Sequence, residues 1–244
     1  MQWLRRKAQN RLAKPQIAAA SREFAKRHPR EHQINLAFDA LHGTDTAEEI
    51  KLTEAGVSQL DAWLGNAVYR SVWEADFHDL LDALGISFEG FTFVDIGSGK
   101  GKAMLMASDY PFERIVGVEY SPILHAIAQR NLAVYRSPAQ RCTKLEAHLG
   151  NALEYRLPEG PVVCVLFNPL ETAAMRQFMR QVEHQVSPRS LPVYVIYFNA
   201  RHIGEVGDAF DGLKKLRILQ KTTKRIIFGN SAAGSHATRR PHGP

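Results

Sequence analysis

Apolar residues follow two alternating periodicities along the middle of the chain, which predicts strands and helices in turn. Continuously apolar runs, typical of strands buried on both faces, cover residues 91–96, 114–119, 162–167 and 191–198. Residues 142–149 alternate between apolar and polar positions, as a half-buried strand does. Helical spacing or composition follows at 101–108, 122–132 and 171–186. The pattern therefore predicts five strands with helices between them.

The order of these segments predicts the fold class. Strands that alternate with helices form an open, mostly parallel sheet with helices on both faces. Ser121 followed by Pro122 marks the start of the second helix, because Ser caps and Pro favours the first helical position. Two short strand-like runs, 216–220 and 224–229, close the chain. We therefore expect an α/β, Rossmann-like, doubly wound sheet that ends in a C-terminal antiparallel hairpin.

Composition is that of an ordinary globular protein. The 244 residues are 45% apolar and 23% charged. No apolar run reaches the 18 or so residues that a membrane-spanning helix needs, and the N-terminus lacks the uninterrupted apolar stretch of a secretory signal. Only Cys142 and Cys164 are present, which excludes a disulfide scaffold and a zinc site built on cysteines. A reducing, cytoplasmic location is therefore expected.

Charge is distributed unevenly. Residues 1–30 hold nine Lys or Arg and one acid, Glu23, whereas residues 31–230 hold twenty Lys or Arg against twenty-four Asp or Glu. We expect a basic helical N-terminal extension over 1–37, a main domain over 38–230 and a disordered tail over 231–244. The extension has the composition of a transit peptide, of an arm for an anionic partner, or of a solvated helix. The mildly acidic main domain argues against a broad nucleic-acid-binding face.

The strongest chemical signal is the segment Asp95-Ile96-Gly97-Ser98-Gly99-Lys100-Gly101, between a strand and a helix. Glycines at such a place permit positive φ and let a ligand approach the backbone closely. The spacing differs from the dinucleotide fingerprint G-x-G-x-x-G, and Asp95 stands two residues before the first glycine. A pyrophosphate disfavours a neighbouring carboxylate, whereas a ligand with an amino group and a sulfonium favours one.

Three further polar positions follow the ends of the next predicted strands. Glu119 ends the second strand, where an acid can accept hydrogen bonds from both ribose hydroxyls of an adenosine. Asn151 follows the third strand and can bond the edge of an adenine, or stabilise a turn of its own backbone. Asn168 and Pro169 follow the fourth strand, where open α/β sheets bind ligands, although Asn-Pro also simply ends strands.

The motifs DIGSGKG, VGVEYS, GNA and FNPL, in this order, resemble the class I (seven-β-strand) methyltransferases that depend on S-adenosyl-L-methionine (SAM). The resemblance covers roughly residues 39–230, and is nearest to a small bacterial group and more distant from the Dot-type histone-lysine methyltransferases. It implies that SAM is the cofactor. The residues that it implies for SAM binding are Asp95, Gly97, Ser98, Gly99, Gly101, Glu119 and Asn151.

The same resemblance bears on the methyl acceptor. Asn168-Pro169 is similar to the start of the Asn-Pro-Pro-aromatic motif of amine methyltransferases, but Leu170 replaces the second Pro, so a flat nucleobase is not implied. Asn151 stands where the family usually has Asp. A carboxamide oxygen or an adjacent carbonyl can accept the N–H of a neutral amine, so Asn168 and Pro169 are the expected catalytic positions. The acceptor is expected to be an amine nitrogen, of a protein lysine or of a small amine.

Two upstream segments, His42–Thr46 and Tyr69–Ser71, resemble parts of the same bacterial group and are candidates for a lid over the cofactor, with Tyr69 in contact with it. The alternatives are a helix capping box at Thr46 and Glu49, and a helical position for Tyr69. His28 and His32 have helical metal spacing, but Pro29 lies between them, so no metal site is expected.

Three functions remain open from the sequence. A SAM-dependent methyltransferase agrees with all four motifs. A nicotinamide-dependent oxidoreductase is opposed by the glycine spacing and by Asp95. A SAM-binding protein without catalysis is the third, because a fold does not guarantee an activity. The identity of the acceptor is not predicted.

Overall fold

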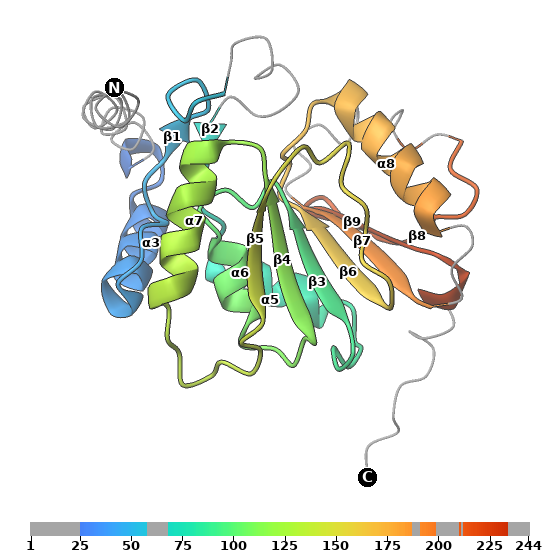
Figure 1. The fold of residues 1–244 in the computed structure, drawn as a ribbon, viewed down its shortest axis with the longest axis horizontal. Coiled ribbons are helices and arrows are strands. Elements are labelled where there is room, and N and C mark those ends of the chain that lie inside the picture. Colours follow the sequence, from blue (N-terminus) through green and yellow to red (C-terminus); the bar gives the residue numbers. More distant parts are fainter. Residues whose placement is uncertain (1–24, 58–67, 187–190, 199–209, 211, 234–244) are drawn as a thin grey trace, which may run out of the picture.

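The computed structural model describes residues 25–57, 68–186, 191–198, 210 and 212–233. In this part of the chain a seven-stranded sheet has the order β5-β4-β3-β6-β7-β9-β8 (Figure 1). Its strands are β3 (Thr92–Ile96), β4 (Arg114–Glu119), β5 (Leu145–Leu149), β6 (Val162–Leu166), β7 (Val193–Phe198), β8 (Arg217–Lys221) and β9 (Arg225–Gly229). All seven coincide with strands predicted from the sequence, within one to three residues at each end.

Strand direction confirms the predicted fold class. Strands β3 to β7 are parallel, and β9 runs antiparallel to both β7 and β8. Strand β3 lies at the centre and pairs with β4 on one side and with β6 on the other. The chain therefore winds outward in both directions from β3, and ligands of such sheets bind outside the carboxyl ends of the strands at this point.

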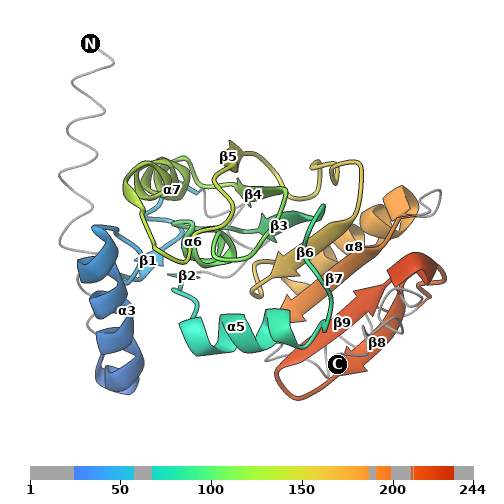
Figure 2. The same cartoon turned by 90° about the horizontal axis from the view of Figure 1, so that it is seen from below.

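Helices cover both faces of the sheet. Helices α5 (Glu74–Asp82), α6 (Lys102–Ala107) and α7 (Pro122–Val134) lie on one face, and α8 (Thr172–Val186) lies on the other (Figures 1 and 2). Ser121 caps α7, since its hydroxyl accepts the backbone N–H of Leu124 at 3.2 Å, as predicted. The expected three-layer α/β arrangement is thus confirmed.

Side chains of the central strands alternate between two apolar clusters. Phe93 of β3 packs in the cluster that includes α5 and α6, while Val94 and Ile96 pack in the cluster that includes α8. Because strand side chains alternate, Asp95 projects to the α6 side, at the end of the strand. Cys164 is fully buried in the α8 cluster, as expected for a small apolar residue.

The segment before the sheet forms a unit that the sequence did not predict in detail. Helix α3 (Pro29–His42) is followed along the chain by β1 (Ile50–Lys51) and β2 (Val68–Tyr69), which pair as a small antiparallel sheet. Thr46 does not cap a helix, because its hydroxyl donates to Asp39 Oδ1 at 2.8 Å. Tyr69 lies in a strand and not in a helix. The two helical alternatives for these residues are therefore wrong.

The predicted domain boundaries stay predictions. Most of the proposed extension (1–24) and most of the proposed tail (234–244) lie outside the described residues. The boundary at residue 37 falls within α3, and Ala233 is buried and accepts the hydroxyl of Tyr194 at 3.1 Å. No helix among the described residues has the length and hydropathy to cross a membrane.

Candidate functional site

The loop between β3 and α6 contains three glycines with positive φ, at 74° for Gly97, 56° for Gly99 and 85° for Gly101. Residues with a side chain rarely adopt such values, so the sequence pattern and the loop shape agree. The N–H groups of Gly97 and Ser98 donate to the carbonyl of Val118 at 2.8 and 3.1 Å. The loop is thereby fixed across the ends of β3 and β4.

Neighbouring groups fill the space where glycine side chains would be. An ideal Cβ on Gly97 would lie 2.4 Å from Cβ of Pro169, and one on Gly99 would lie 2.3 Å from Cε2 of Tyr69. Gly101 begins α6, away from the cavity described below, and its ideal Cβ lies 3.3 Å from Cβ of Ala128. Two of the glycines therefore bring site residues together, whereas Gly101 permits close packing of α6 on α7.

Glu119 connects the loop to the end of β4. One carboxylate oxygen accepts the N–H of Gly99 and the other accepts the N–H of Ser121, each at 2.7 Å. The residue is 6% exposed. Burial raises the pKa of Glu119, while the backbone N–H donors of Ser121, Gly99 and Tyr120 oppose this rise. Each carboxylate oxygen has two lone pairs, so these bonds leave capacity for ligand hydroxyls.

Asp95 lies beside Glu119, below the loop. It is 3% exposed, and burial together with the charge of Glu119 raises the pKa of Asp95 to about 7. Two buried carboxyl groups side by side are costly when both are ionised, because like charges repel in a medium of low polarity. A positively charged ligand would relieve this cost, so the pair favours a cation in the cavity.

Asn168 and Pro169 lie across the edge of the sheet from the glycine loop. Asn168 is 9% exposed and has a φ of 54°, the one positive φ of a residue other than glycine in the described part of the chain. Its Oδ1 accepts a hydrogen bond from the hydroxyl of Tyr197 in β7. The predicted acceptor position is therefore a constrained turn that is anchored from the neighbouring strand.

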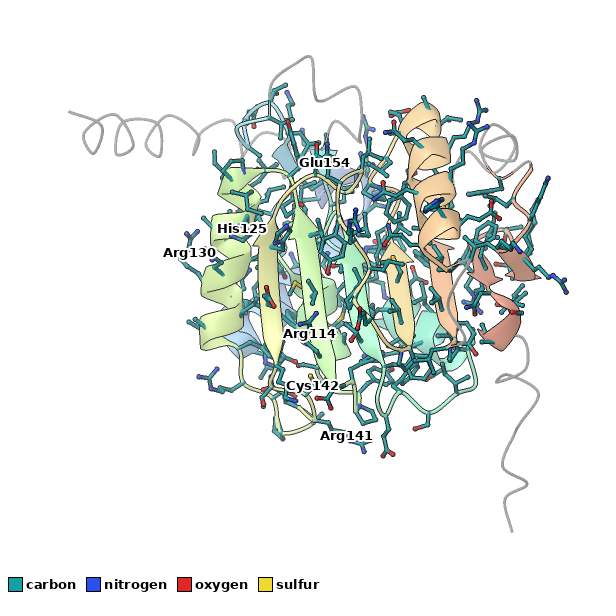
Figure 3. All side chains as sticks on the ribbon, turned by 45° about the vertical axis from the view of Figure 1, so that its right-hand side comes forward. Arg114, His125, Arg130, Arg141, Cys142 and Glu154 are labelled. Atoms are coloured by element: carbon teal, nitrogen blue, oxygen red, sulfur yellow. The ribbon has the colours of Figure 1, made fainter. Side chains whose placement is uncertain are left out.

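Asn151 stabilises its own turn. Its Oδ1 accepts the N–H of Leu153 at 2.9 Å, and its Nδ2 lies 3.4 Å from Oε1 of Glu154. Figure 3 labels Glu154 near the upper end of the sheet. The turn alternative from the sequence is thus realised. Asn151 still lines the cavity, and its contact with an adenine stays a prediction.

One cavity brings the predicted positions together. It encloses about 1150 Å³ of space, which includes the open solvent at its mouth. The predicted residues that line it are Tyr69, Asp95, Gly97, Ser98, Gly99, Glu119, Asn151, Asn168 and Pro169. Ser98 Oγ is buried without a hydrogen-bond partner among the described residues. An ideal Cβ on Gly117 would lie 2.7 Å from Ser98 Oγ, so this hydroxyl packs against β4 and does not face the open cavity.

Tyr69 lines the cavity and lies against the glycine loop. Its ring packs against Gly99, and its hydroxyl donates to the carbonyl of Thr46 at 2.9 Å. Thr46 is in turn held by Asp39 of α3, which accepts the N–H groups of Thr46 and Ala47 at 2.7 Å. Both upstream segments thus lie against the glycine loop, and a lid over the cofactor stays a prediction.

Lys100 of the glycine loop connects to the upstream segment through Asp45. Its Nζ is buried and donates to Asp45 Oδ1 at 2.6 Å. Asn131 of α7 binds the backbone of both segments, since its Nδ2 donates to the carbonyl of Lys100 at 2.8 Å and to that of Asp45 at 3.0 Å. This contact could not be predicted from the sequence, because Asp45 and Asn131 lie 86 positions apart along the chain.

Two basic residues line the cavity: Arg70 belongs to the predicted segment Tyr69–Ser71, whereas Lys102 was not predicted from the sequence. Arg70 lines the cavity and donates to Glu49 at 2.9 Å. Lys102 also lines it, is 2% exposed, and donates to Asn35 Oδ1 of α3 at 2.7 Å. Burial lowers the pKa of Lys102 to about 8. A Lys at the start of a helix is normally solvated, so only the packing of α3 reveals its burial.

Comparisons with known proteins bear on the fold alone. No family model matches the chain, and no curated protein matches it. A solved structure from Methanococcus maripaludis, described as a candidate SAM-dependent methyltransferase, is 15% identical with a TM-score of 0.48, over 64% of this chain and 83% of that one. Geranyl diphosphate C-methyltransferase from Streptomyces coelicolor is 14% identical with a TM-score of 0.44, over 64% and 78%.

A third similar structure is an RNA methyltransferase from Salinibacter ruber, in complex with S-adenosyl-L-homocysteine. It is 18% identical with a TM-score of 0.44, over 65% of this chain and 90% of that one. Identities and scores in this range do not carry an activity from one chain to another. A function for this chain therefore has to be argued from its own site.

Proposed function

We propose that this protein is a SAM-dependent methyltransferase that transfers a methyl group to an amine nitrogen. The observation that carries the proposal is the pair of buried carboxyl groups, Asp95 and Glu119, beside a glycine loop at the central switch point of the sheet. This arrangement suits a ligand that combines a positive charge with a ribose.

The residues present fit SAM. Glu119 is placed to accept ribose hydroxyls at the end of β4, and Asp95 is placed to offset positive charge beside the loop. A dinucleotide would place a pyrophosphate against the same two carboxyl groups, which disfavours the nicotinamide alternative.

Bound SAM supplies an electrophilic methyl group on a positively charged sulfur. The chain's own contribution is to hold the acceptor in line with that methyl, and such alignment is worth roughly 7–11 kcal/mol of the barrier. Asn168 offers a carboxamide oxygen with a second lone pair, and the carbonyls of its turn offer further acceptors. These groups suit the N–H of an uncharged amine, such as that of a protein lysine or a small amine, and do not deprotonate a hydroxyl.

Binding and transfer are tested separately. Titration calorimetry with SAM and with NAD should show binding of SAM alone. Tritiated SAM should then label one fraction of a bacterial lysate, and the label should reside on nitrogen. Binding of NAD would support the oxidoreductase, SAM binding without transfer would support a non-catalytic SAM-binding protein, and label on oxygen or carbon would refute the amine acceptor.

We further propose that the basic residues 1–30 form an arm for an anionic partner that is separate from the cofactor site. Within the described chain, Lys26 lies just before α3 and Arg30 lies in its first turn, and both are exposed, whereas the cavity lies over the sheet. The concentration of positive charge at this end supports the proposal, because it exceeds what solubility requires.

A further inference from the structure

Tyr197 and Asn168 form a buried polar pair between two neighbouring strands. Tyr197 lies in β7, fully buried among side chains of the α8 cluster, and its hydroxyl donates to Asn168 Oδ1. Asn168 lies two residues beyond Leu166, which pairs with Tyr197 in the parallel ladder of β6 and β7. The bond therefore reaches from the interior of the sheet to the turn at its carboxyl end.

The backbone of Asn168 needs such support. At a φ of 54° a residue with a side chain is strained, although Asn tolerates this region better than most. Pro169, the next residue, lies directly against Gly97. A change in the turn at Asn168 would therefore displace the contact between the acceptor side of the cavity and the glycine loop.

We propose that Tyr197 is a positioning residue for methyl transfer, whose hydroxyl holds the Asn168 turn in the conformation that presents its acceptor groups to the cavity. This inference rests on the proposed function of the same site. Tyr197 itself does not line the cavity, so it acts through Asn168 and not on the substrate.

The chemistry of the pair agrees with this role. Burial and the charge of Glu171 together raise the pKa of Tyr197 to about 12, so the hydroxyl keeps its proton at any physiological pH. A hydroxyl that donates fixes which end of the carboxamide faces it, because the amide nitrogen has no lone pair to offer. The bond thus determines the orientation of the amide as well as the backbone of the turn.

The test compares two tyrosines of the same strand. Tyr197→Phe removes the hydroxyl that binds Asn168, and Tyr194→Phe removes an equally buried hydroxyl that donates to Ala233 at 3.1 Å in the other apolar cluster. Both variants should lose similar stability in thermal unfolding and keep the calorimetric affinity for SAM. At saturating SAM, the rate of tritium transfer to the acceptor fraction should fall about tenfold or more in Tyr197→Phe alone, as expected for a misaligned acceptor.

A second pair of variants approaches the bond from its other partner. Asp and Gly both tolerate the left-handed backbone, but only Asp keeps an oxygen for the Tyr197 hydroxyl. Asn168→Asp should therefore retain more transfer activity than Asn168→Gly. Tyr197→Phe should cost Asn168→Gly nothing further, because the bond is already lost. The comparison of Asn168→Asp with Asn168→Gly still tests the bond if Tyr197→Phe does not fold.

The outcomes separate this inference from the proposed function. If the wild type transfers no label to any fraction, the proposed function fails and the inference fails with it. If the wild type is active and Tyr197→Phe transfers label as fast as Tyr194→Phe, the positioning role is refuted and the methyltransferase assignment stands. Additive losses in the Tyr197→Phe and Asn168→Gly double variant would also refute it.

Discussion

Gly97 and Pro169 touch across the carboxyl edge of the sheet, with the ideal Cβ position of Gly97 only 2.4 Å from Cβ of Pro169. Gly97 belongs to the loop after β3, and Pro169 belongs to the turn after β6, the neighbouring parallel strand. The absence of a side chain at position 97 is what lets these two segments meet. The proposed cofactor loop and the proposed acceptor turn are therefore parts of one packed unit.

Gly97→Ala should disturb both segments. A methyl group at this position must displace Pro169, and the positive φ adds strain of about 1–2 kcal/mol. We expect SAM affinity by calorimetry to fall at least tenfold and transfer to be lost. Gly90→Ala is the matched control. Gly90 has a φ of 76°, close to the 74° of Gly97, but nothing lies within 4 Å of its ideal Cβ. Equal SAM affinity in the two variants would contradict the contact's role.

Glu119→Gln should weaken SAM binding by about 2–3 kcal/mol, because a charge-assisted acceptor is replaced by a group of which one end is a donor. The backbone N–H of Gly99 or of Ser121 would then face an amide donor, so the loop should also become less ordered. Calorimetry with SAM measures the loss. The control is Glu113→Gln, an exposed acid that precedes the same strand. Unchanged affinity in Glu119→Gln would remove Glu119 from the cofactor site.

Asp95 should give both stability and SAM affinity a pH dependence. Its pKa is about 7 in the folded protein and 3.8 in the unfolded chain, so folding takes up a proton between these values. The free energy of unfolding without ligand should therefore fall as pH rises from about 4 to 7, by at most about 1.4 kcal/mol per pH unit from this group.

Asp95→Asn should flatten that slope in denaturant titrations and stabilise the free protein at pH 7.5. Over pH 5.5 to 7.5 the wild type should bind SAM more tightly as Asp95 becomes ionised, since a carboxylate attracts the positive ligand. The Asn variant should lack this increase and bind more weakly at pH 7.5. A wild-type affinity that is constant over this range would argue against contact between Asp95 and the positive charge of SAM.

Lys102 should make the free energy of unfolding depend on pH in the alkaline range, with a sign opposite to that of the Asp95 contribution. Burial lowers its pKa from 10.5 to about 8, so the unfolded chain binds more protons than the folded protein between these values. The contribution of Lys102 to the free energy of unfolding should rise as pH increases from 8 to about 10.5, whereas that of Cys164, whose pKa burial raises from 9.0, should fall above about pH 9. Lys102→Met should remove the rise, whereas Lys144→Met, at an exposed Lys, should keep it. A rise that persists in Lys102→Met would assign it to another group.

Removal of residues 1–24 should leave the cofactor site unchanged. The described site is built from residues beyond this segment, and the arm is proposed to bind a separate anionic partner. SAM affinity by calorimetry should stay within about twofold, while binding to heparin as a polyanion probe should weaken and lose much of its salt dependence. A large loss of SAM affinity would show that the arm contributes to the cofactor site.

The hydrophobic pattern was sufficient for the sheet and for most of the site. The central strands, which include Val94 and Cys164, have apolar residues on both faces because helices cover both faces of the sheet. Each such strand is therefore a continuous apolar run in the sequence. Asp95 and Glu119 lie at the ends of such runs, and Asn168 follows one directly. Parallel strands bring their carboxyl ends to one edge, so the convergence of these residues could be predicted from strand order alone.

Only the tertiary structure decided how these residues are held. The partners of Glu119, Lys102 and Asn168 are Gly99, Asn35 and Tyr197, which lie 20, 67 and 29 positions away. Sequence periodicity reports which face of an element is buried, but it carries no information on which distant element covers that face. The burial of Lys102, the left-handed turn at Asn168 and the contact of Tyr69 with Gly99 all depend on such packing, and so do the pKa values that burial shifts.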